Sequence, residues 1–190
     1  MFAFKNKYFF IIENTKDINL NNVKKHNKFY IIYRPNILRE NLTQLIQFKK
    51  KCNLKSIKFY IANNLRLCVS TKADGVYLSS SNSSFRALNF KRVNFDIIGS
   101  AHNHKEIKLK DRQGCSFILF SKLFLVNYNQ RSPYLGVIRF NNLINQTKKK
   151  IIALGGINST NLNMLKISNC YGFALMSEVK KKPAIIDRLF

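Results

Sequence analysis

Short apolar runs recur along the whole chain and are separated by longer polar segments. Each run holds four to six residues, is rich in Ile, Val, Phe and Tyr, and is almost continuous instead of alternating between apolar and polar positions. Continuous runs of this length are typical of strands buried on both faces, and such strands belong to parallel sheets covered by helices. The pattern predicts eight strands, at residues 8–12, 29–33, 57–62, 75–78, 95–99, 115–120, 150–154 and 172–176.

The segments between the runs contain helical patterns of unequal length. Residues 36–53 predict an amphipathic helix with lysines 49–51 near its end. Its apolar positions, at three- and four-residue spacings, are Leu38, Leu42, Leu45, Ile46 and Phe48. Residues 158–170 repeat the pattern more briefly and predict a helix that begins near Asn158 or Ser159 and is capped by Ser159 or Thr160. Its expected apolar positions are Leu162, Leu165 and Ile167.

Eight strands with their connections predict an α/β fold. Parallel strands need crossover connections of about a dozen residues, usually helical. Residues 13–28 leave room for only two helical turns, so some helices are expected to be short. The prediction is one compact (β/α)8 TIM barrel over residues 1–190. A doubly wound open sheet is the alternative, because periodicity alone does not show whether a sheet closes.

Composition sets bounds on the class of protein. The formal net charge of +24 suits anionic ligands. It does not by itself indicate a nucleic-acid partner, because the basic residues are spread along the chain and no RNA-recognition signature accompanies them. Many Asn, Lys, Ile and Phe residues also fit the codon bias of an A/T-rich genome, which is enough to produce a basic chain.

Cysteine spacing and the apolar runs bear on cofactors and location. Four widely spaced cysteines predict buried, reduced thiols in place of a zinc site or a disulfide framework. The first residues lack the long apolar region and cleavage site of a signal peptide, and no run reaches the length of a membrane span. We therefore expect a cytoplasmic protein without a membrane partner.

The residues that follow the predicted strands indicate an anion site. In a (β/α)8 barrel these positions meet at one end and carry the chemistry. They are polar or cationic and include no carboxylate, which suits phosphate better than a metal ion or an acidic base. They are Arg34, Asn63, Asn64, residues 79–82, Ser100, His102, Ser121, Lys122, Gly155, Gly156 and Ser177.

The stretch KKKIIALGGINSTNLNML, at residues 148–165, is the clearest of these sites. A buried strand runs into two glycines and then into a polar segment that favours a helix start. Glycines allow the backbone to approach a ligand closely, and backbone N–H groups in such a turn bind anions. This stretch therefore predicts a phosphate cradle at Gly155 and Gly156.

Several motifs, in chain order, resemble the thiamine phosphate synthase and aminothiazole tautomerase superfamily. ADGVYL at residues 73–78 is similar to its A-D-G-V-H-L, and IIGSAHNHKE at 97–106 to its I-G-x-S-x-H-x-x-x-E. Residues 116–136 have the layout of its strand-6 segment. ALGGIN at 153–158 and YGFALMSEV at 171–179 are similar to its last two strand ends. The resemblance covers most of the chain and implies a (β/α)8 barrel.

The resemblance implies a transferase of thiamine biosynthesis. Such synthases join a hydroxymethylpyrimidine pyrophosphate to a thiazole phosphate and release pyrophosphate, with Mg²⁺ on the leaving group. It assigns the thiazole phosphate to Gly155, Gly156 and Ser177. Arg34, Ser100 and Lys122 become the catalytic candidates.

The pyrophosphate half of the family pattern is altered in this chain. Asn63 matches a family asparagine, whereas Asn64 and Asn82 stand where the family has Asp ligands for Mg²⁺. Asparagine keeps an oxygen donor but lacks the charge that holds a hard cation. The family lysine of the strand-6 loop falls near Asn129, with Arg131 as a substitute. Direct neutralisation of pyrophosphate by Arg34, Lys122 and Arg131, without a metal, is the corresponding hypothesis.

Two other functions stay open at this point. One is a tautomerase-like enzyme that moves protons on a thiazole phosphate. Lys122 transfers those protons only if burial or neighbouring cations lower its pKa, and His102 is expected to be a structural or substrate-edge residue and not a base. The other is a barrel that binds a phosphorylated ligand without turnover. All three functions imply small phosphorylated partners.

Overall fold

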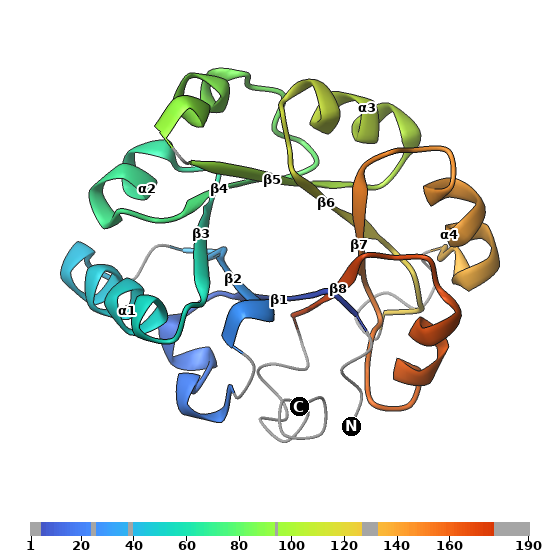
Figure 1. The fold of residues 1–190 in the computed structure, drawn as a ribbon, viewed down its shortest axis with the longest axis horizontal. Helices are drawn as coiled ribbons and strands as arrows, with labels where there is room; N and C mark the ends of the chain where they lie inside the picture. The colour runs from blue at the N-terminus through green and yellow to red at the C-terminus, as the bar shows by residue number, and fades with distance from the viewer. Residues whose placement is uncertain (1–4, 24–25, 38–39, 94, 127–132, 177–190) are drawn as a thin grey trace.

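The structure is a computed structural model, and it describes residues 5–23, 26–37, 40–93, 95–126 and 133–176. Eight parallel strands close into a barrel in sequence order (Figure 1). Closure is direct, because Tyr8 of the first strand pairs with Phe29 of the second and with Phe173 of the last. The predicted (β/α)8 barrel is therefore confirmed, and the open sheet is wrong.

The strands lie where the apolar runs predict them, with ends that shift by at most two residues. Their bounds are β1 Lys7–Ile12, β2 Phe29–Tyr33, β3 Lys58–Ala62, β4 Gly75–Leu78, β5 Asp96–Ala101, β6 Phe117–Ser121, β7 Lys150–Leu154 and β8 Gly172–Leu175.

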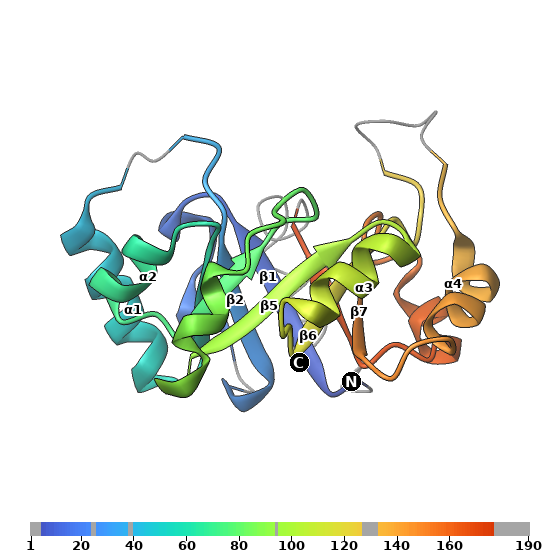
Figure 2. The same ribbon diagram turned by 90° about the horizontal axis from the view of Figure 1, so that it is seen from above.

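The connections are shorter than in a regular barrel. The α-helices are α1 Leu42–Leu54, α2 Leu65–Thr71, α3 His104–Arg112 and α4 Gly136–Ile144. The 3-10 helices are η1 Thr15–Asp17, η2 Leu20–Asn22, η3 His26–Lys28, η4 Arg86–Val93 and η5 Leu162–Ile167. Figure 2 shows α1 and α2 on one side of the barrel and α4 on the opposite side. In the described part of the chain, no helix has the length and apolar character needed to cross a membrane.

Local sequence explains where α1 begins. The Asn41 side chain accepts a hydrogen bond from the N–H of Gln44 and the Gln44 side chain accepts one from the N–H of Asn41, which is a capping box. The predicted core positions Leu45 and Phe48 are buried, and Leu38 lies outside the described residues. Leu42 is 44% exposed, because it occupies the first turn of the helix.

The helix predicted to begin near Asn158 or Ser159 is wrong in its type and its start. The chain forms a turn there and then the 3-10 helix η5, with Asn161 as its N-cap. The Asn158 Oδ1 atom accepts from the N–H groups of Thr160 at 2.9 Å and Asn161 at 3.2 Å. These side-chain bonds compete with the first helical turn. Leu162 and Leu165 are buried as predicted, whereas Ile167 is 67% exposed.

The core has two layers that follow from the alternation of side chains along each strand. Outward side chains pack under the helices, as Phe10 does, while inward side chains such as Phe9 and Ile11 fill the barrel. Stacked aromatic rings fill the barrel toward the amino-terminal ends of the strands. The Phe9 and Tyr30 ring centroids are 4.8 Å apart, and the Tyr30 and Tyr60 centroids are 5.8 Å apart. Space for a ligand is therefore left toward the other end.

Candidate functional site

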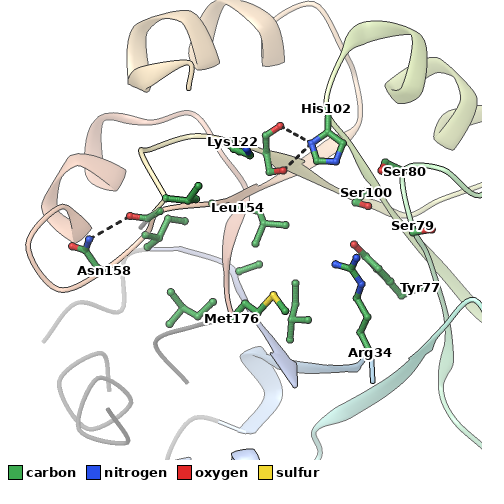
Figure 3. Close-up of a pocket in the computed structure, with 18 of the residues that line it drawn as sticks. Arg34, Tyr77, Ser79, Ser80, Ser100, His102, Lys122, Leu154, Asn158 and Met176 are labelled. Atoms are coloured by element: carbon green, nitrogen blue, oxygen red, sulfur yellow. Dashed lines mark hydrogen bonds between the residues drawn. The ribbon is translucent and has the colours of Figure 1, made fainter. Parts of the chain in front are cut away.

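A cavity of about 530 Å³ opens at the carboxyl ends of the strands (Figure 3). Its described lining contains cations, hydroxyls, glycines and apolar side chains, but no Asp or Glu. The lining residues are Ile11, Arg34, Tyr77, Ser79, Ser80, Ser100, His102, Ser121, Lys122, Leu125, Val126, Leu154, Gly155, Gly156, Ile157, Asn158, Ala174, Leu175 and Met176. Nine of the predicted strand-end residues meet here: Arg34, Ser79, Ser80, Ser100, His102, Ser121, Lys122, Gly155 and Gly156.

Arg34 approaches the cavity from the end of β2. Its backbone N–H donates to the Ile12 carbonyl at 2.8 Å, which extends the β1–β2 ladder past the strand end. Figure 3 shows its side chain near Tyr77 on the same side of the cavity as Ser100. Burial raises the pKa of Tyr77, while a hydrogen bond with Ser100 and the charge of Arg34 oppose that rise. The phenol therefore stays neutral and able to donate a hydrogen bond.

Lys122 and the glycine turn lie side by side. The ladder between β6 and β7 continues beyond both strands, because Leu123 N–H donates to the Leu154 carbonyl and Phe124 N–H to the Gly155 carbonyl, both at 3.0 Å. A Cβ atom added to Gly155 would lie 3.1 Å from the Lys122 Cα. The lysine side chain and the glycine backbone thus belong to one wall of the cavity.

The glycine turn offers backbone donors. Gly155 and Gly156 adopt φ values of 96° and 68°, in the left-handed region that favours glycine. Among the described residues, the N–H groups of Gly155, Gly156 and Ile157 have no protein acceptor. Successive N–H groups in such a turn can bind an anion. The helix expected to begin near Asn158 or Ser159 does not add a dipole to this turn, since η5 begins only at Leu162.

His102 is held against the end of β6. Its Nδ1 atom lies 3.1 Å from the Ser121 carbonyl oxygen and 3.0 Å from the Ser121 Oγ atom. A carbonyl oxygen only accepts hydrogen bonds, so Nδ1 carries a proton in this geometry and Nε2 is the ring nitrogen that remains for a ligand. Dashed lines in Figure 3 mark the two contacts of one His102 ring nitrogen, and the other ring nitrogen is directed away from them.

The apolar half of the cavity was not predicted. Ile11, Leu154, Ala174 and Met176 give it a surface that suits a flat heterocycle. No signal in the sequence separates these residues from the core, because each strand is buried on both faces and its inward positions are equally apolar.

The predicted residues Asn63, Asn64 and Asn82 lie beside the cavity and do not line it. Asn63 Oδ1 accepts from Ser79 N–H at 3.0 Å and from Asn82 Nδ2 at 2.9 Å, and Ser79 itself reaches the cavity. Asn64 is the N-cap of α2. Asn63 and Asn82 therefore shape the loop that presents Ser79 and Ser80, whereas Asn64 fixes the start of α2.

The residues present do not fit a magnesium ion. The Oδ1 atoms of Asn64 and Asn82 already accept backbone N–H groups, from Leu67 at 3.0 Å and Ser84 at 2.9 Å. The described residues contain no cluster of three or more His, Cys, Asp or Glu side chains able to hold a metal. Mg²⁺ prefers carboxylate oxygens, which this edge of the site does not supply.

Three predicted site residues, Asn129, Arg131 and Ser177, lie outside the described residues. The four cysteines are free and buried, as predicted. Burial raises the pKa of Cys52 and of Cys68 to about 12, so neither thiol is an ionised nucleophile.

Comparison with known proteins agrees with this architecture. A family model described as Thiamine monophosphate synthase matches residues 29–179. Thiamine-phosphate synthase of Prochlorococcus marinus subsp. pastoris is 26% identical over 140 residues, which cover 73% of this chain and 40% of that protein. Thiamine-phosphate synthase of Methanococcus vannielii is 23% identical over 121 residues, which cover 64% of this chain and 59% of that protein. The chain thus spans about half the length of these curated relatives.

The solved structure of thiamine phosphate pyrophosphorylase from Pyrococcus furiosus has the same fold. It superposes with a TM-score of 0.72 at 14% identity, over 99% of this chain and 98% of that one. The family model covers well over half of this chain, and strand-end residues in its range, among them Arg34, Ser100 and Lys122, line one cavity. This chain belongs to the thiamine monophosphate synthase family.

Proposed function

We propose that this chain is a thiamine-phosphate-synthase-like transferase of thiamine biosynthesis. It joins a hydroxymethylpyrimidine pyrophosphate to a thiazole phosphate and releases pyrophosphate. The bond from the pyrimidine methylene carbon to the pyrophosphate oxygen breaks, and its electron pair leaves with pyrophosphate. The thiazole nitrogen then uses its lone pair to form the new C–N bond. Residues 1–190 act as one barrel domain, in the cytoplasm.

The observation that carries the proposal is the composition of the cavity within this family. Arg34 and Lys122 line a cavity that also contains apolar side chains, hydroxyls and the glycine turn, with no carboxylate in the described lining. This combination supports binding of heterocycles that carry phosphoryl groups, because fixed donors neutralise the anion while the apolar wall contacts the ring.

The roles follow from position. Arg34, Ser100 and Lys122 are the proposed catalytic residues at the pyrophosphate, where negative charge grows as the C–O bond breaks. Gly155 and Gly156, together with Ser177, are proposed to bind the thiazole phosphate. Asn63 supports the Ser79 loop, and Asn129 and Arg131 are proposed to contribute from the strand-6 loop.

Incubation with the two substrates is expected to give thiamine phosphate, detected by mass spectrometry. Arg34→Ala should lower kcat/KM about tenfold to a hundredfold, the loss expected when one hydrogen bond to a charged group is removed. Arg139→Ala is the matched control, because Arg139 is exposed on α4. Absence of product in both Mg²⁺ and EDTA would contradict synthase activity, and ligand binding without turnover would indicate a barrel that only binds.

His102 favours a second candidate function, proton transfer on a thiazole phosphate. Its Nδ1 atom is fixed by Ser121, which leaves Nε2 as a base at the cavity. Exchange of thiazole-phosphate protons in D2O, followed by NMR, should then fall at least tenfold in His102→Gln and persist in His104→Gln. Equal rates in both variants would exclude this role for His102.

A further inference from the structure

The loop after β4 and the turn after β3 form a closed hydrogen-bond network at the edge of the cavity. Asn63 Nδ2 donates to Ser79 Oγ at 3.0 Å, while Asn63 Oδ1 accepts from Ser79 N–H and from Asn82 Nδ2. Asn82 Oδ1 accepts from Ser84 N–H. The amide oxygens of both asparagines are therefore already used within the protein.

The amide oxygen of Asn64, the residue after Asn63, also accepts a hydrogen bond within the protein. Asn64 Oδ1 accepts from Leu67 N–H and its carbonyl accepts from Cys68 N–H, so Asn64 caps α2. A side chain that turned toward a cation would leave the helix start uncapped, which costs about 1 kcal/mol in typical proteins.

A buried cation lies directly behind this loop. Lys110 of α3 is 0% exposed, and its Nζ atom donates to the Asn82 carbonyl at 2.7 Å and to Gln113 Oε1 at 3.0 Å. Gln113 Nε2 donates to the same Asn82 carbonyl at 3.0 Å. The local electrostatics at Asn82 thus disfavour a second positive charge and favour a ligand anion.

The carboxylate of Glu106, next to the cavity, also has its hydrogen-bond partners within the protein. Glu106 accepts from the N–H of His102 at 2.7 Å and from Asn103 Nδ2 at 2.8 Å, at the start of α3. Glu106 does not line the cavity, and the described lining has no acidic group. Its charged residues are Arg34 and Lys122, which are suited to neutralise a diphosphate directly.

We propose that this cavity binds diphosphate-bearing ligands without a divalent cation, the asparagine network having replaced the metal and Arg34 and Lys122 supplying the positive charge. The inference rests on the proposed function for its substrate, the pyrimidine pyrophosphate, and assigns that substrate's diphosphate to a metal-free site. The side chains of Arg34 and Lys122 bind the phosphoryl oxygens, and the Ser79 loop contributes hydroxyl and backbone donors.

The test is calorimetric titration of the intact chain with inorganic pyrophosphate, in EDTA and in Mg²⁺. Binding in EDTA is expected, with an affinity within threefold of that in Mg²⁺ or higher. Arg34→Ala/Lys122→Ala should weaken it more than tenfold, whereas Lys108→Ala/Arg139→Ala, which removes equal charge from exposed positions on α3 and α4, should leave it unchanged. Absence of binding in EDTA, or binding more than tenfold tighter in Mg²⁺, would overturn the proposal.

A gain-of-metal variant sharpens the test. Asn64→Asp/Asn82→Asp is expected to weaken binding in EDTA and to make Mg²⁺ enhance it about tenfold, and aspartate at position 64 still caps a helix. Asn142→Asp, exposed on α4, is the charge-matched control and should show neither effect. Equal enhancement by Mg²⁺ in the wild type and the double variant would overturn the proposal.

The two proposals fail separately. Because the probe is inorganic pyrophosphate, metal-free binding without thiamine phosphate formation contradicts only the synthase activity. Strictly Mg²⁺-dependent binding together with product formation contradicts only the metal-free site.

Discussion

Replacing Gly156 with alanine is expected to lower the free energy of unfolding by about 3 kcal/mol and to abolish phosphate binding in the cavity. Gly156 has a φ of 68°, where a side chain costs roughly 1–2 kcal/mol. A Cβ atom there would also lie 2.3 Å from the Leu125 carbonyl oxygen and 2.6 Å from that of Phe124. Relief of this overlap requires the backbone to move, which adds about 1–3 kcal/mol.

Gly136→Ala separates the two causes. Gly136 has nearly the same φ, 69°, but a Cβ atom there meets nothing within 4 Å. Its expected loss is only the backbone cost, about 1–2 kcal/mol. Urea unfolding of both variants measures the difference, which isolates the close approach of the glycine turn to the segment after β6. Equal losses in the two variants would refute this explanation.

The same pair of variants tests the phosphate cradle. The backbone movement expected in Gly156→Ala displaces the N–H groups of residues 155–157 relative to Lys122. Gly136, by contrast, lies outside the cavity lining. Titration with inorganic phosphate should therefore show binding in Gly136→Ala and none in Gly156→Ala. Retained binding in a folded Gly156→Ala protein would exclude the glycine turn as the phosphate cradle.

The strands were predictable because burial on both faces leaves a strong signal. Residues 29–33, 75–78 and 150–154 match β2, β4 and β7 without any shift. Closure of the sheet is predicted from the number of strands and from the family resemblance, and not from the apolar pattern itself. The pairing of β1 with β8 joins residues far apart in the chain, such as Phe9 and Ala174, and no local pattern reports it.

The error at residues 158–161 has a local cause. The helical pattern includes Asn158 and Asn161, but their short side chains form hydrogen bonds with nearby backbone groups instead. Asn161 Nδ2 donates to the Gly156 carbonyl at 2.7 Å, which ties the turn back to the glycines. Asparagine side chains compete with helix formation in this way. The spacing of apolar residues does not show whether the helix or the side-chain hydrogen bonds will form.

The candidate site was predictable where its residues directly follow strands. Arg34, Ser100 and Lys122 were found by that rule and meet in one cavity. The network of Asn63, Ser79 and Asn82 was not, because it depends on how two loops face each other across β3 and β4. The sequence identified a missing charge at Asn64 and Asn82, and the structure shows that their amides have a structural use instead.

Asp74, in the ADGVYL stretch, joins the barrel to its helical layer. Its Oδ2 atom accepts from the Phe59 N–H at 2.7 Å and pairs with Lys49 of α1. Its backbone also bonds to both neighbouring strands, to the Phe59 carbonyl at 2.9 Å and from the Asp96 N–H at 3.0 Å. Lys49 is only 4% exposed, and its Nζ atom donates hydrogen bonds to this carboxylate and to Asn53 Oδ1, the latter at 2.6 Å.

Asp74→Ala is therefore expected to lower the free energy of unfolding by about 3–5 kcal/mol, because it leaves a buried ammonium without its counter-ion. The matched control is Asp111→Ala, whose pair with Lys149 is more exposed and should cost at most about 1 kcal/mol. Adding Lys49→Met to Asp74→Ala should restore more than half of the loss in urea unfolding, because the unpaired charge is then gone. If Lys49→Met restores nothing, the ion pair is not the cause, and the stabilising contribution of Asp74 lies instead in its hydrogen bond to the Phe59 N–H at the start of β3.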